Sequence, residues 1–399
     1  MSVTASFRDP IHGFIQADEL ETALINSRPM QRLRWIRQLG MAYLVFPGAE
    51  HSRFSHVLGV MHLAGRVYDA IAQASDGLLE PGETARDRRL VRAAALLHDI
   101  GHPPFSHSAE ELFEEPIHHE EMTCRLIGLP EVADLFAEKG DGITGEDVTH
   151  VLTGPRDSRE RLLSQIVAGE LDVDKMDYLR RDSLYCGVSY GSYDLDRLLH
   201  TMQPLRDPAT RDWGLGVDEG GVHALEGLVM ARYYMFTQVY FNVVSKAYEL
   251  HLSRWLEDES LRWPIDPERF LATDDITTWT KMRQSRSAHA VAVVSRRAFP
   301  LAFETDEHLG DADRQRFEAL VPAIEEQFGA DRLMISNSGK DPHRLGEARV
   351  FARRFDGSLS PMAEASHFIR HLARIERFRV YAAHEIVEDV RSTLRDLWA

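Results

Sequence analysis

The sequence predicts a mainly helical protein that ends in a smaller region of mixed helices and strands. Residues 56–74 place apolar side chains at intervals of three and four positions, the period of a helix buried on one face, and residues 90–100 are almost entirely apolar. After about residue 275, β-branched and alternating runs bounded by Gly, Asp and Asn become frequent. A chain of 399 residues also exceeds the roughly 250–300 residues at which a single core stops growing. We therefore expect one domain over residues 1–274 and another over residues 275–399.

In the first domain, helices are expected to alternate with polar connections. Residues 31–40 should form a helix that ends at its closing glycine, and the helix over residues 56–74 comes next. Residues 76–90 are rich in polar residues, glycine and proline, so a connection is expected there. The helix over residues 90–100 should be buried, and Gly101 with the two prolines that follow ends it.

The later elements are expected to be more varied. Residues 161–183 should form one helix, and residues 213–225 a hairpin that turns at the Asp-Glu-Gly-Gly sequence. A long helix would then continue to about Glu257. The second domain should close with a helix over residues 382–396, and we expect this domain to serve oligomerisation or regulation.

The composition is that of an ordinary globular protein, with 44% apolar and 27% charged residues. The formal net charge of −17 repels polyphosphate, so a broad nucleic-acid-binding surface is not expected. No apolar run approaches about 18 residues, and the N-terminal segment lacks a basic stretch followed by an apolar one, so we expect neither a membrane span nor a signal peptide. The two cysteines, Cys124 and Cys186, lie far apart, which favours the reducing cytoplasm and excludes a disulfide framework.

Two imidazoles and two carboxylates are candidate metal ligands: His56, His98, Asp99 and Asp174. His98 and Asp99 are adjacent in an apolar helix, where a buried imidazole and carboxylate need partners. A divalent metal would be such a partner, and this ligand set without a thiolate suits Mn, Fe, Mg, Co, Ni or Zn. A hydrogen-bonded His-Asp pair in the core is the alternative interpretation of these two residues.

Further ionisable side chains follow within a short region: His102, His107, His118, His119 and Glu120. Core histidines with satisfied hydrogen bonds explain one or two of them but poorly explain the whole group. Imidazoles gathered near a metal indicate acid/base catalysis or anion stabilisation near neutral pH.

Three residues recur at i, i+4 and i+8 of one predicted helix: Asp174, Tyr178 and Asp182. This spacing puts them on one face over about 12 Å, the reach of a nucleotide. A solvated helix face is an equally good reading, because Asp177 and Arg181 form an i,i+4 pair on the same helix.

Two basic residues adjoin the candidate ligands. Arg53 lies three positions before His56, where a guanidinium could clamp phosphate oxygens, and Lys175 directly follows Asp174.

Six segments together resemble the HD-domain deoxynucleoside triphosphate triphosphohydrolases, a family that includes the sterile-alpha-motif-linked enzyme and its bacterial relatives. They are FRDPIHG (7–13), QRLRWIRQLG (31–40), VFPGAEHSRFSHVLGV (45–60), LLHDIGHPPFSH (96–107), HHEEM (118–122) and DVDKMDYLRRD (172–182). The match runs to about residue 255, and RVFARRFDGSLSPMAEASHFIRHL resembles the C-terminal part of bacterial members. The resemblance implies an HD-domain helical fold without a preceding sterile-alpha-motif domain.

The resemblance also implies a role for each candidate residue. The metal ligands would be His56, His98, Asp99 and Asp174. Four residues would act in catalysis, with His119 as the catalytic histidine, Glu120 behind it, and two imidazoles lining the phosphates, His102 and His107. Phosphates would contact Arg53 and Lys175, while the sugar and its 3′-hydroxyl would contact Tyr178 and Asp182. The deoxyribose and base would lie beside Gln38 and Leu39.

A regulatory nucleotide site between subunits is implied for Gln31, Arg34 and Val45. At Asn26 the chain departs from the family, because an acidic residue that reads guanine would be expected there. An acid accepts from both guanine N–H groups more strongly than an amide carbonyl does.

The implied reaction is the metal-dependent hydrolysis of a deoxynucleoside triphosphate to a deoxynucleoside and tripolyphosphate, in a cytoplasmic homo-oligomer, either a dimer or a tetramer. One alternative is an HD-type nucleotidase or phosphodiesterase that acts on another nucleotide. The other is a nucleotide-sensing assembly module with weak catalysis, which the complete ligand set and His119 disfavour.

Overall fold

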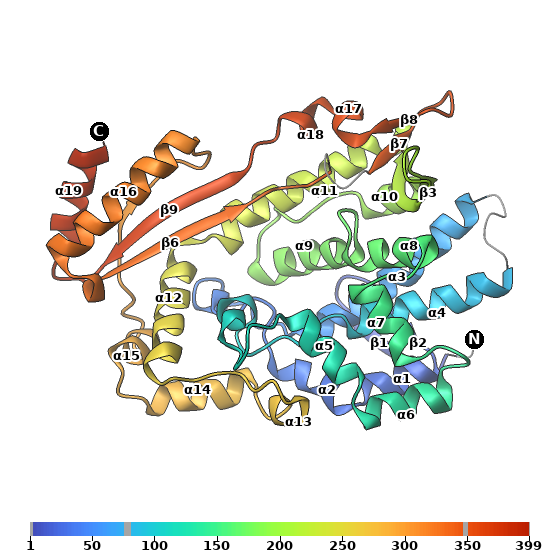
Figure 1. The fold of residues 1–399 in the computed structure, drawn as a ribbon, viewed down its shortest axis with the longest axis horizontal. Coiled ribbons are helices and arrows are strands. Elements are labelled where there is room, and N and C mark those ends of the chain that lie inside the picture. Colours follow the sequence, from blue (N-terminus) through green and yellow to red (C-terminus); the bar gives the residue numbers. More distant parts are fainter. Residues whose placement is uncertain (1–2, 76–80, 346–349, 399) are drawn as a thin grey trace.

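The computed structural model describes residues 3–75, 81–345 and 350–398 (Figure 1). A mainly helical body contains most of the chain, and a long antiparallel pair of strands leads from it to two helices near the C-terminus (Figure 1). The predicted class, mainly helical with a C-terminal region of helices and strands, is confirmed. Among the helices so described, none combines the length and the apolar character that a membrane span requires.

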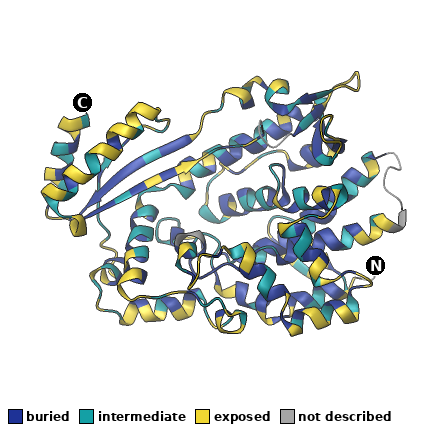
Figure 2. Ribbon diagram, in the orientation of Figure 1, coloured by how far each residue is buried: buried dark blue, intermediate teal, exposed yellow. Residues whose placement is uncertain are grey.

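The central helix is α3 (Arg53–Ala74), which packs against α4 (Pro81–Leu97) and α9 (Val173–Cys186). Its fully buried side chains recur at the expected spacing: Val57, Val60, Ala64, Val67 and Ile71. Each fully buried Val or Ile contributes about 1.5–3 kcal/mol by leaving water. Figure 2 shows this interior as buried ribbon enclosed by more exposed outer helices.

The N-terminal segment forms a hairpin of β1 (Ala5–Asp9) and β2 (Gly13–Ala17), which lies against the helical body. The Asp9 carboxylate accepts hydrogen bonds from the backbone N–H groups of Ile11 and His12, and these bonds fix the turn. Gly13 has a φ of 76°, a conformation that glycine adopts without strain. The turn places Asp9 and His12 beside α9.

The predicted helix over residues 31–40 is wrong in its second half. Helix α2 (Arg28–Arg32) passes into a 3₁₀ turn, η1 (Leu33–Trp35), and the chain then becomes extended. Arg37 forms a bridge with Ser52, and its backbone N–H donates to the Asp275 carboxylate at 2.9 Å. These tertiary hydrogen bonds replace those that a continued helix would have made.

The connection predicted over residues 76–90 is also wrong in part, because α4 begins at Pro81. Proline fits the first turn of a helix, where its missing N–H has no partner to lose. Residues 76–80 lie outside the described residues. Helix α4 ends at Leu97, so His98 and Asp99 occupy the turn after the helix and not its interior.

The region predicted as one helix over residues 161–183 contains two, α8 (Ser158–Ala168) and α9. Asp157 and Asp172 cap their N-terminal ends: the Asp157 side chain accepts two backbone N–H groups of the first turn, and the Asp172 side chain accepts one. The break places Asp174 in the first turn of α9, where it faces the end of α4.

The predicted hairpin over residues 213–225 is wrong, because β4 (Trp213–Asp218) pairs with the preceding strand β3 (Met202–Arg206). Its Gly-Gly sequence leads instead into α11 (Val222–Met235). A π-helical turn, η5 (Phe236–Tyr240), and the cap residue Asn242 then separate α11 from α12 (Val243–Asp258), so the predicted long helix is interrupted.

The C-terminal region builds a second, smaller core. Its antiparallel sheet has the order β5-β9-β6, and α16 and α19 pack on it around Phe317, Val380 and Leu394. The closing helix starts later than predicted because residue 382 still belongs to a strand. These elements are β5 (Leu301–Glu304), α16 (Asp311–Phe328), β6 (Leu333–Lys340), β9 (Ile375–Ala382) and α19 (Val387–Trp398).

The boundary at residue 275 stays a prediction. Met282 and Ala290 lie beyond it but are buried in the large core, whereas the second core begins near Ala302. The apolar run at residues 290–294, read as β-like, belongs to the helix α15 (Ala288–Val294).

The other described elements connect or cover these parts. A second sheet has the order β3-β4-β7-β8. Its last two strands are β7 (Phe351–Arg353) and β8 (Leu359–Pro361). The further helices are α1 (Glu19–Ile25), α5 (His119–Ile127), α6 (Pro130–Lys139), α7 (Gly145–Thr153), α10 (Leu195–Thr201), α13 (Pro267–Phe270), α14 (Asp275–Gln284), α17 (Met362–Ala365) and α18 (His367–His371). The further 3₁₀ turns are η2 (Ala42–Leu44), η3 (Ser106–Leu112), η4 (Glu219–Gly221) and η6 (Ala330–Arg332).

Candidate metal centre and active-site cavity

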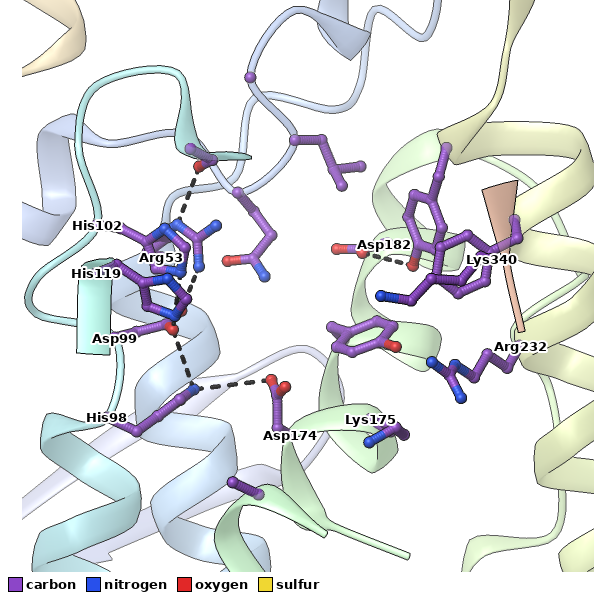
Figure 3. Close-up of a pocket in the computed structure, with 18 of the residues that line it drawn as sticks. Arg53, His98, Asp99, His102, His119, Asp174, Lys175, Asp182, Arg232 and Lys340 are labelled. Atoms are coloured by element: carbon purple, nitrogen blue, oxygen red, sulfur yellow. Dashed lines mark hydrogen bonds and ion pairs between the residues drawn. The ribbon is translucent and has the colours of Figure 1, made fainter. Parts of the chain in front are cut away.

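A cavity of about 900 Å³ lies within the helical body. One wall comes from α3, the end of α4 and the start of α5, and the opposite wall comes from α9, α11 and α12 (Figure 3). Histidines and Asp99 line the first wall, whereas Lys340 and Arg232 lie across the cavity from them (Figure 3). A cavity of this volume is typical of small-molecule sites.

The four predicted metal ligands come together beside this cavity, and three of them line it: His98, Asp99 and Asp174. The Asp174 Oδ1 lies 3.0 Å from His56 Nε2 and 3.7 Å from His98 Nε2. Asp99 places Oδ1 at 3.3 Å from His98 Nε2 and Oδ2 at 3.9 Å from His56 Nε2. Ligands bound about 2.1 Å from one metal ion are roughly 3.0–3.4 Å apart. The separations of 3.0 and 3.3 Å lie in this range, and those of 3.7 and 3.9 Å exceed it by at most about 0.5 Å, so a small contraction of the cluster would suit a shared ion.

The hydrogen bonding of the ring nitrogens of His56 and His98 also indicates a metal site. His98 Nδ1 donates to the carbonyl oxygen of Ala95 at 2.8 Å, which leaves Nε2 to face the cluster. Within the described part of the chain, the Nε2 atoms of His56 and His98 are buried without a hydrogen-bond partner. Buried polar atoms of this kind are costly unless a ligand satisfies them. His56, His98 and Asp99 place ligand atoms close enough to one another to hold a divalent metal ion, and Asp174 Oδ1 lies within reach of both imidazoles as a second carboxylate.

A buried hydrogen-bond network, which the sequence did not reveal, contacts His56 at Nδ1, the ring nitrogen that does not face the cluster. This nitrogen donates to Asp177 Oδ2 at 2.9 Å, and His12 Nε2 lies 2.7 Å from Asp177 Oδ1. Asp177 and Arg181 are both fully buried, so the interpretation of this helix face as solvated is wrong. The i,i+4 spacing was the only signal for this pair, and it could not show which face of α9 is covered.

The charges in the cluster are strongly coupled to their surroundings. Burial alone would lower the pKa of His56, but the adjacent Asp174 and Asp177 carboxylates outweigh it and raise that pKa to about 10. Burial alone would raise the pKa of Asp99, yet Arg53 and the neighbouring imidazoles hold that pKa well below its usual value. Asp99 is therefore a carboxylate at neutral pH, and a metal ion competes with a proton for His56 Nε2.

His102 and His119 lie side by side on the first wall, with ring centroids 3.9 Å apart and planes inclined by 19°. His102 Nε2 lies 3.2 Å from Asp99 Oδ1, and burial together with the Arg53 cation holds the pKa of His102 well below its ordinary value. His102 is therefore a neutral imidazole. The side chain of His107, a further predicted residue, lies outside the described residues.

His119 is oriented mainly by Glu110 from η3, which forms a close contact with its Nδ1. The predicted partner, Glu120, is more distant, with Oε2 at 3.4 Å from the same nitrogen, and its side chain is exposed. No local pattern marks Glu110, because its approach to α5 depends on the path of the 3₁₀ turn.

The phosphate-binding candidates are held by carboxylates in this structure. Arg53 pairs with Asp99, and its Nε donates to Ser106 Oγ at 3.0 Å. Lys175 Nζ donates to Asp172 Oδ2 at 2.6 Å, and burial followed by the charge of Asp174 raises the pKa of Asp172 to about 6. Both cations line the cavity.

Two more cations reach the cavity from distant parts of the chain. Arg232 comes from α11 and Lys340 from the end of β6, and neither belongs to a recognised motif. Burial and the nearby cations Arg232, Lys175 and Arg344 lower the pKa of Lys340. This mutual repulsion makes the wall a favourable place for a polyanion.

The face of α9 predicted to contact a sugar lines the same cavity, from Asp174 through Tyr178 to Asp182. The Asp182 carboxylate accepts from His51 Nε2 and from the Tyr240 hydroxyl, each at 2.8 Å. The Tyr178 ring meets the Tyr240 ring edge-on at 6.1 Å, and burial raises the pKa of both phenols, so both stay neutral.

Gln38 and Leu39 also line the cavity, as predicted for residues beside a base. Among the described residues, Gln38 Oε1 is buried without a hydrogen-bond partner. This carbonyl oxygen is therefore an acceptor that a ligand could satisfy.

The residues predicted for a regulatory nucleotide lie elsewhere. Gln31, Arg34 and Val45 do not line the cavity. Arg34 is exposed, its Nε donates to Gln31 Oε1 at 2.8 Å, and its guanidinium lies 3.6 Å from the centre of the Phe54 ring. Asn26, where the chain departs from the family pattern, is exposed at the end of α1.

Comparison with known proteins gives two family matches. The HD domain matches residues 53–182, and the HD associated region matches residues 193–398. The Bacillus subtilis (strain 168) protein YwfO, described only as uncharacterized, is 39% identical over 272 residues, or 66% of this chain. The chain spans 59% of the length of that relative.

Two further relatives extend over almost the whole chain. The Dictyostelium discoideum protein named deoxynucleoside triphosphate triphosphohydrolase SAMHD1 homolog is 28% identical over 98% of this chain and 79% of its own length. The crystal structure of a hypothetical protein from Aquifex aeolicus superposes with a TM-score of 0.83 and 31% identity, covering 98% of this chain and 99% of that one.

Proposed function

The chain belongs to the HD-domain family and carries the HD associated region, and from this premise we propose that it is a phosphohydrolase that converts deoxynucleoside triphosphates to a deoxynucleoside and tripolyphosphate. One observation carries the proposal. A single cavity is lined by residues of the His-Asp cluster, by a group of cations and by the polar face of α9, the three kinds of group that would contact the metal, the phosphates and the sugar of such a substrate. The name of the Dictyostelium relative supports the same substrate class.

The order of the groups along α9 is the basis for orienting the substrate. Asp174 and Lys175 lie in the first turn, at the cluster, and Tyr178 and Asp182 follow one and two turns later. Phosphates at the cluster would also contact Arg53, while a deoxyribose would reach Asp182 with its 3′-hydroxyl. The α-phosphate would then lie between the cluster and the sugar.

The chain's own groups account for binding and proton transfer. His56, His98, Asp99 and Asp174 would hold the divalent ion, which when bound polarises a phosphoryl oxygen and lowers the pKa of a water molecule. Arg53, Lys175 and Arg232 would offset the charge of the phosphates. With its Nδ1 donating to Glu110, His119 would exchange a proton at Nε2 with the leaving 5′-oxygen.

Digestion of dGTP is expected to yield deoxyguanosine and intact tripolyphosphate, because attack at the α-phosphorus expels the nucleoside and leaves the phosphate chain whole. GTP should be cleaved roughly 5- to 150-fold less well. A 2′-hydroxyl packed against Tyr178 without a partner would cost about 1–3 kcal/mol. Phosphorus NMR identifies the products, and in ¹⁸O-labelled water the label should enter tripolyphosphate.

The same digest separates the alternatives. Pyrophosphate and dGMP as products would contradict the proposed alignment of cluster, phosphate and sugar. Cleavage of dGMP or of a phosphodiester with dGTP left intact would favour a nucleotidase or phosphodiesterase. Binding of dGTP without turnover, in protein loaded with metal, would favour a nucleotide-sensing assembly module.

We also propose that a regulatory nucleotide binds at Gln31, Arg34 and Val45 between subunits of a homo-oligomer. The exposed guanidinium of Arg34 and the exposed indole of Trp35 support this placement. A ligand can shift assembly only if it binds the assembled state more tightly. Light scattering with each NTP and dNTP should therefore show a higher mass, and Arg34→Glu should abolish the change. An unchanged mass in every nucleotide would contradict this proposal.

A further inference from the structure

We propose that Asp177 is a positioning residue that, supported by His12 and Arg181, fixes which nitrogen of His56 faces the metal ion. The inference rests on the metal centre of the proposed function but not on the identity of the substrate. Asp177 itself is fully buried and does not line the cavity. It would therefore act only through His56.

The hydrogen bond between His56 and Asp177 determines the tautomer. A carboxylate can only accept, so the hydrogen of His56 lies on Nδ1, 2.9 Å from Asp177 Oδ2. Once the proton on Nε2 is displaced, the lone pair lies on that atom, which is 3.0 Å from Asp174 Oδ1 in the cluster. A metal ion binds that lone pair, and partners of this kind orient ligating histidines in many metal sites.

Asp177 is in turn held on both oxygens. Arg181 donates from Nε to Oδ2 at 2.7 Å and from Nη2 to Oδ1 at 2.9 Å, and His12 Nε2 lies 2.7 Å from Oδ1. Arg181 is anchored at its far end by Asp9 Oδ2 at 2.8 Å. The cation offsets the cost of burying the carboxylate, and the two-sided contact fixes its plane.

Glycine at position 59 gives a second and independent indication. Gly59 lies within α3, one turn after His56, where glycine costs roughly 0.5–1 kcal/mol relative to alanine. A Cβ at this position would lie 1.9 Å from Asp177 Oδ1 and 2.5 Å from Arg181 Nη2. The helix thus leaves room at this point for the carboxylate that holds His56.

The test measures metal affinity without substrate. Zn²⁺ is titrated by calorimetry into metal-free wild type, Asp177→Asn and Gly59→Ala, and we expect both variants to bind roughly 10–100-fold more weakly. The control is Glu21→Gln, which also removes a charge from a buried carboxylate paired with a buried arginine, here Arg92 at 2.6 Å. This control should lose stability but keep its Zn²⁺ affinity.

A spectroscopic measurement separates positioning from general destabilisation. In the Zn²⁺-loaded wild type, proton NMR should show a downfield, exchange-protected Nδ1–H resonance of His56. That resonance should move or vanish in Asp177→Asn and persist in Glu21→Gln. If Asp177→Asn does not fold, Gly59→Ala and His12→Gln make the same comparison.

The possible results separate the positioning role of Asp177 from the metal centre and from the proposed reaction. Wild-type Zn²⁺ affinity and an unchanged His56 resonance in the folded variants would overturn the positioning role alone. A wild-type protein that binds no Zn²⁺ would refute the metal centre and this inference with it. Products other than tripolyphosphate would refute the proposed substrate chemistry and leave this inference standing.

Discussion

Replacing Asp99 by Ala is expected to remove the bound metal ion and nearly all turnover together. Asp99 supplies carboxylate oxygens within 3.3 Å of His98 Nε2 and 3.9 Å of His56 Nε2, so its loss breaks the ligand set. A bound metal ion contributes several kcal/mol of transition-state stabilisation, which corresponds to more than about 10³-fold in rate. Elemental analysis of the purified variant and dGTP turnover measure the two effects, and His98→Ala should behave in the same way.

The change also leaves Arg53 buried without its carboxylate, which is destabilising. Asp99→Asn keeps the shape of the side chain, and circular dichroism establishes whether each variant is folded. Asp147→Asn is a matched control, because Asp147 is a buried carboxylate on α7 that pairs with Arg86 and Arg156 and does not line the cavity. Normal metal content in folded Asp99→Ala protein would remove Asp99 from the ligand set.

Replacing His119 by Ala is expected to preserve the metal ion while turnover falls by roughly 10²–10⁴-fold, the range of general acid–base catalysis. His119 lies outside the four-ligand set but stacks on His102 at the same end of the cavity, and Glu110 orients its ring. Removing the imidazole would take away the proton donor for the leaving oxygen and leave the cluster intact. Single-turnover kinetics and metal analysis of the same sample test this expectation.

His118→Ala is the matched control for that experiment. His118 is the preceding residue, but its side chain is 82% exposed, so it should keep turnover near the wild-type value. Near-normal turnover in His119→Ala protein with its metal retained would exclude His119 from the mechanism. Loss of the metal from His119→Ala would instead make His119 a further ligand.

Several elements could not be delimited from the sequence because tertiary hydrogen bonds override local preference. Residues 31–40 have a helical pattern, but the backbone at Arg37 bonds to Ser52 and Asp275 instead. Conversely, the polar composition of residues 81–89 predicted a connection, yet α4 extends through them. The pairing of β4 with β3 similarly depends on the position of the whole sheet.

The sequence by itself determined the family, the helical class, the metal-binding character and the shared helix face of Asp174, Tyr178 and Asp182. These features depend on residue type and on helical spacing, which are local properties. Spacing fixes how side chains on one helix lie relative to one another, but it does not fix which face becomes buried. The burial of Asp177 and Arg181 depends on α3 and on His12, which lies 165 positions away in the chain. The same reason explains Glu110, Arg232 and Lys340: only the folding of distant segments against one another brings their charges to this cavity.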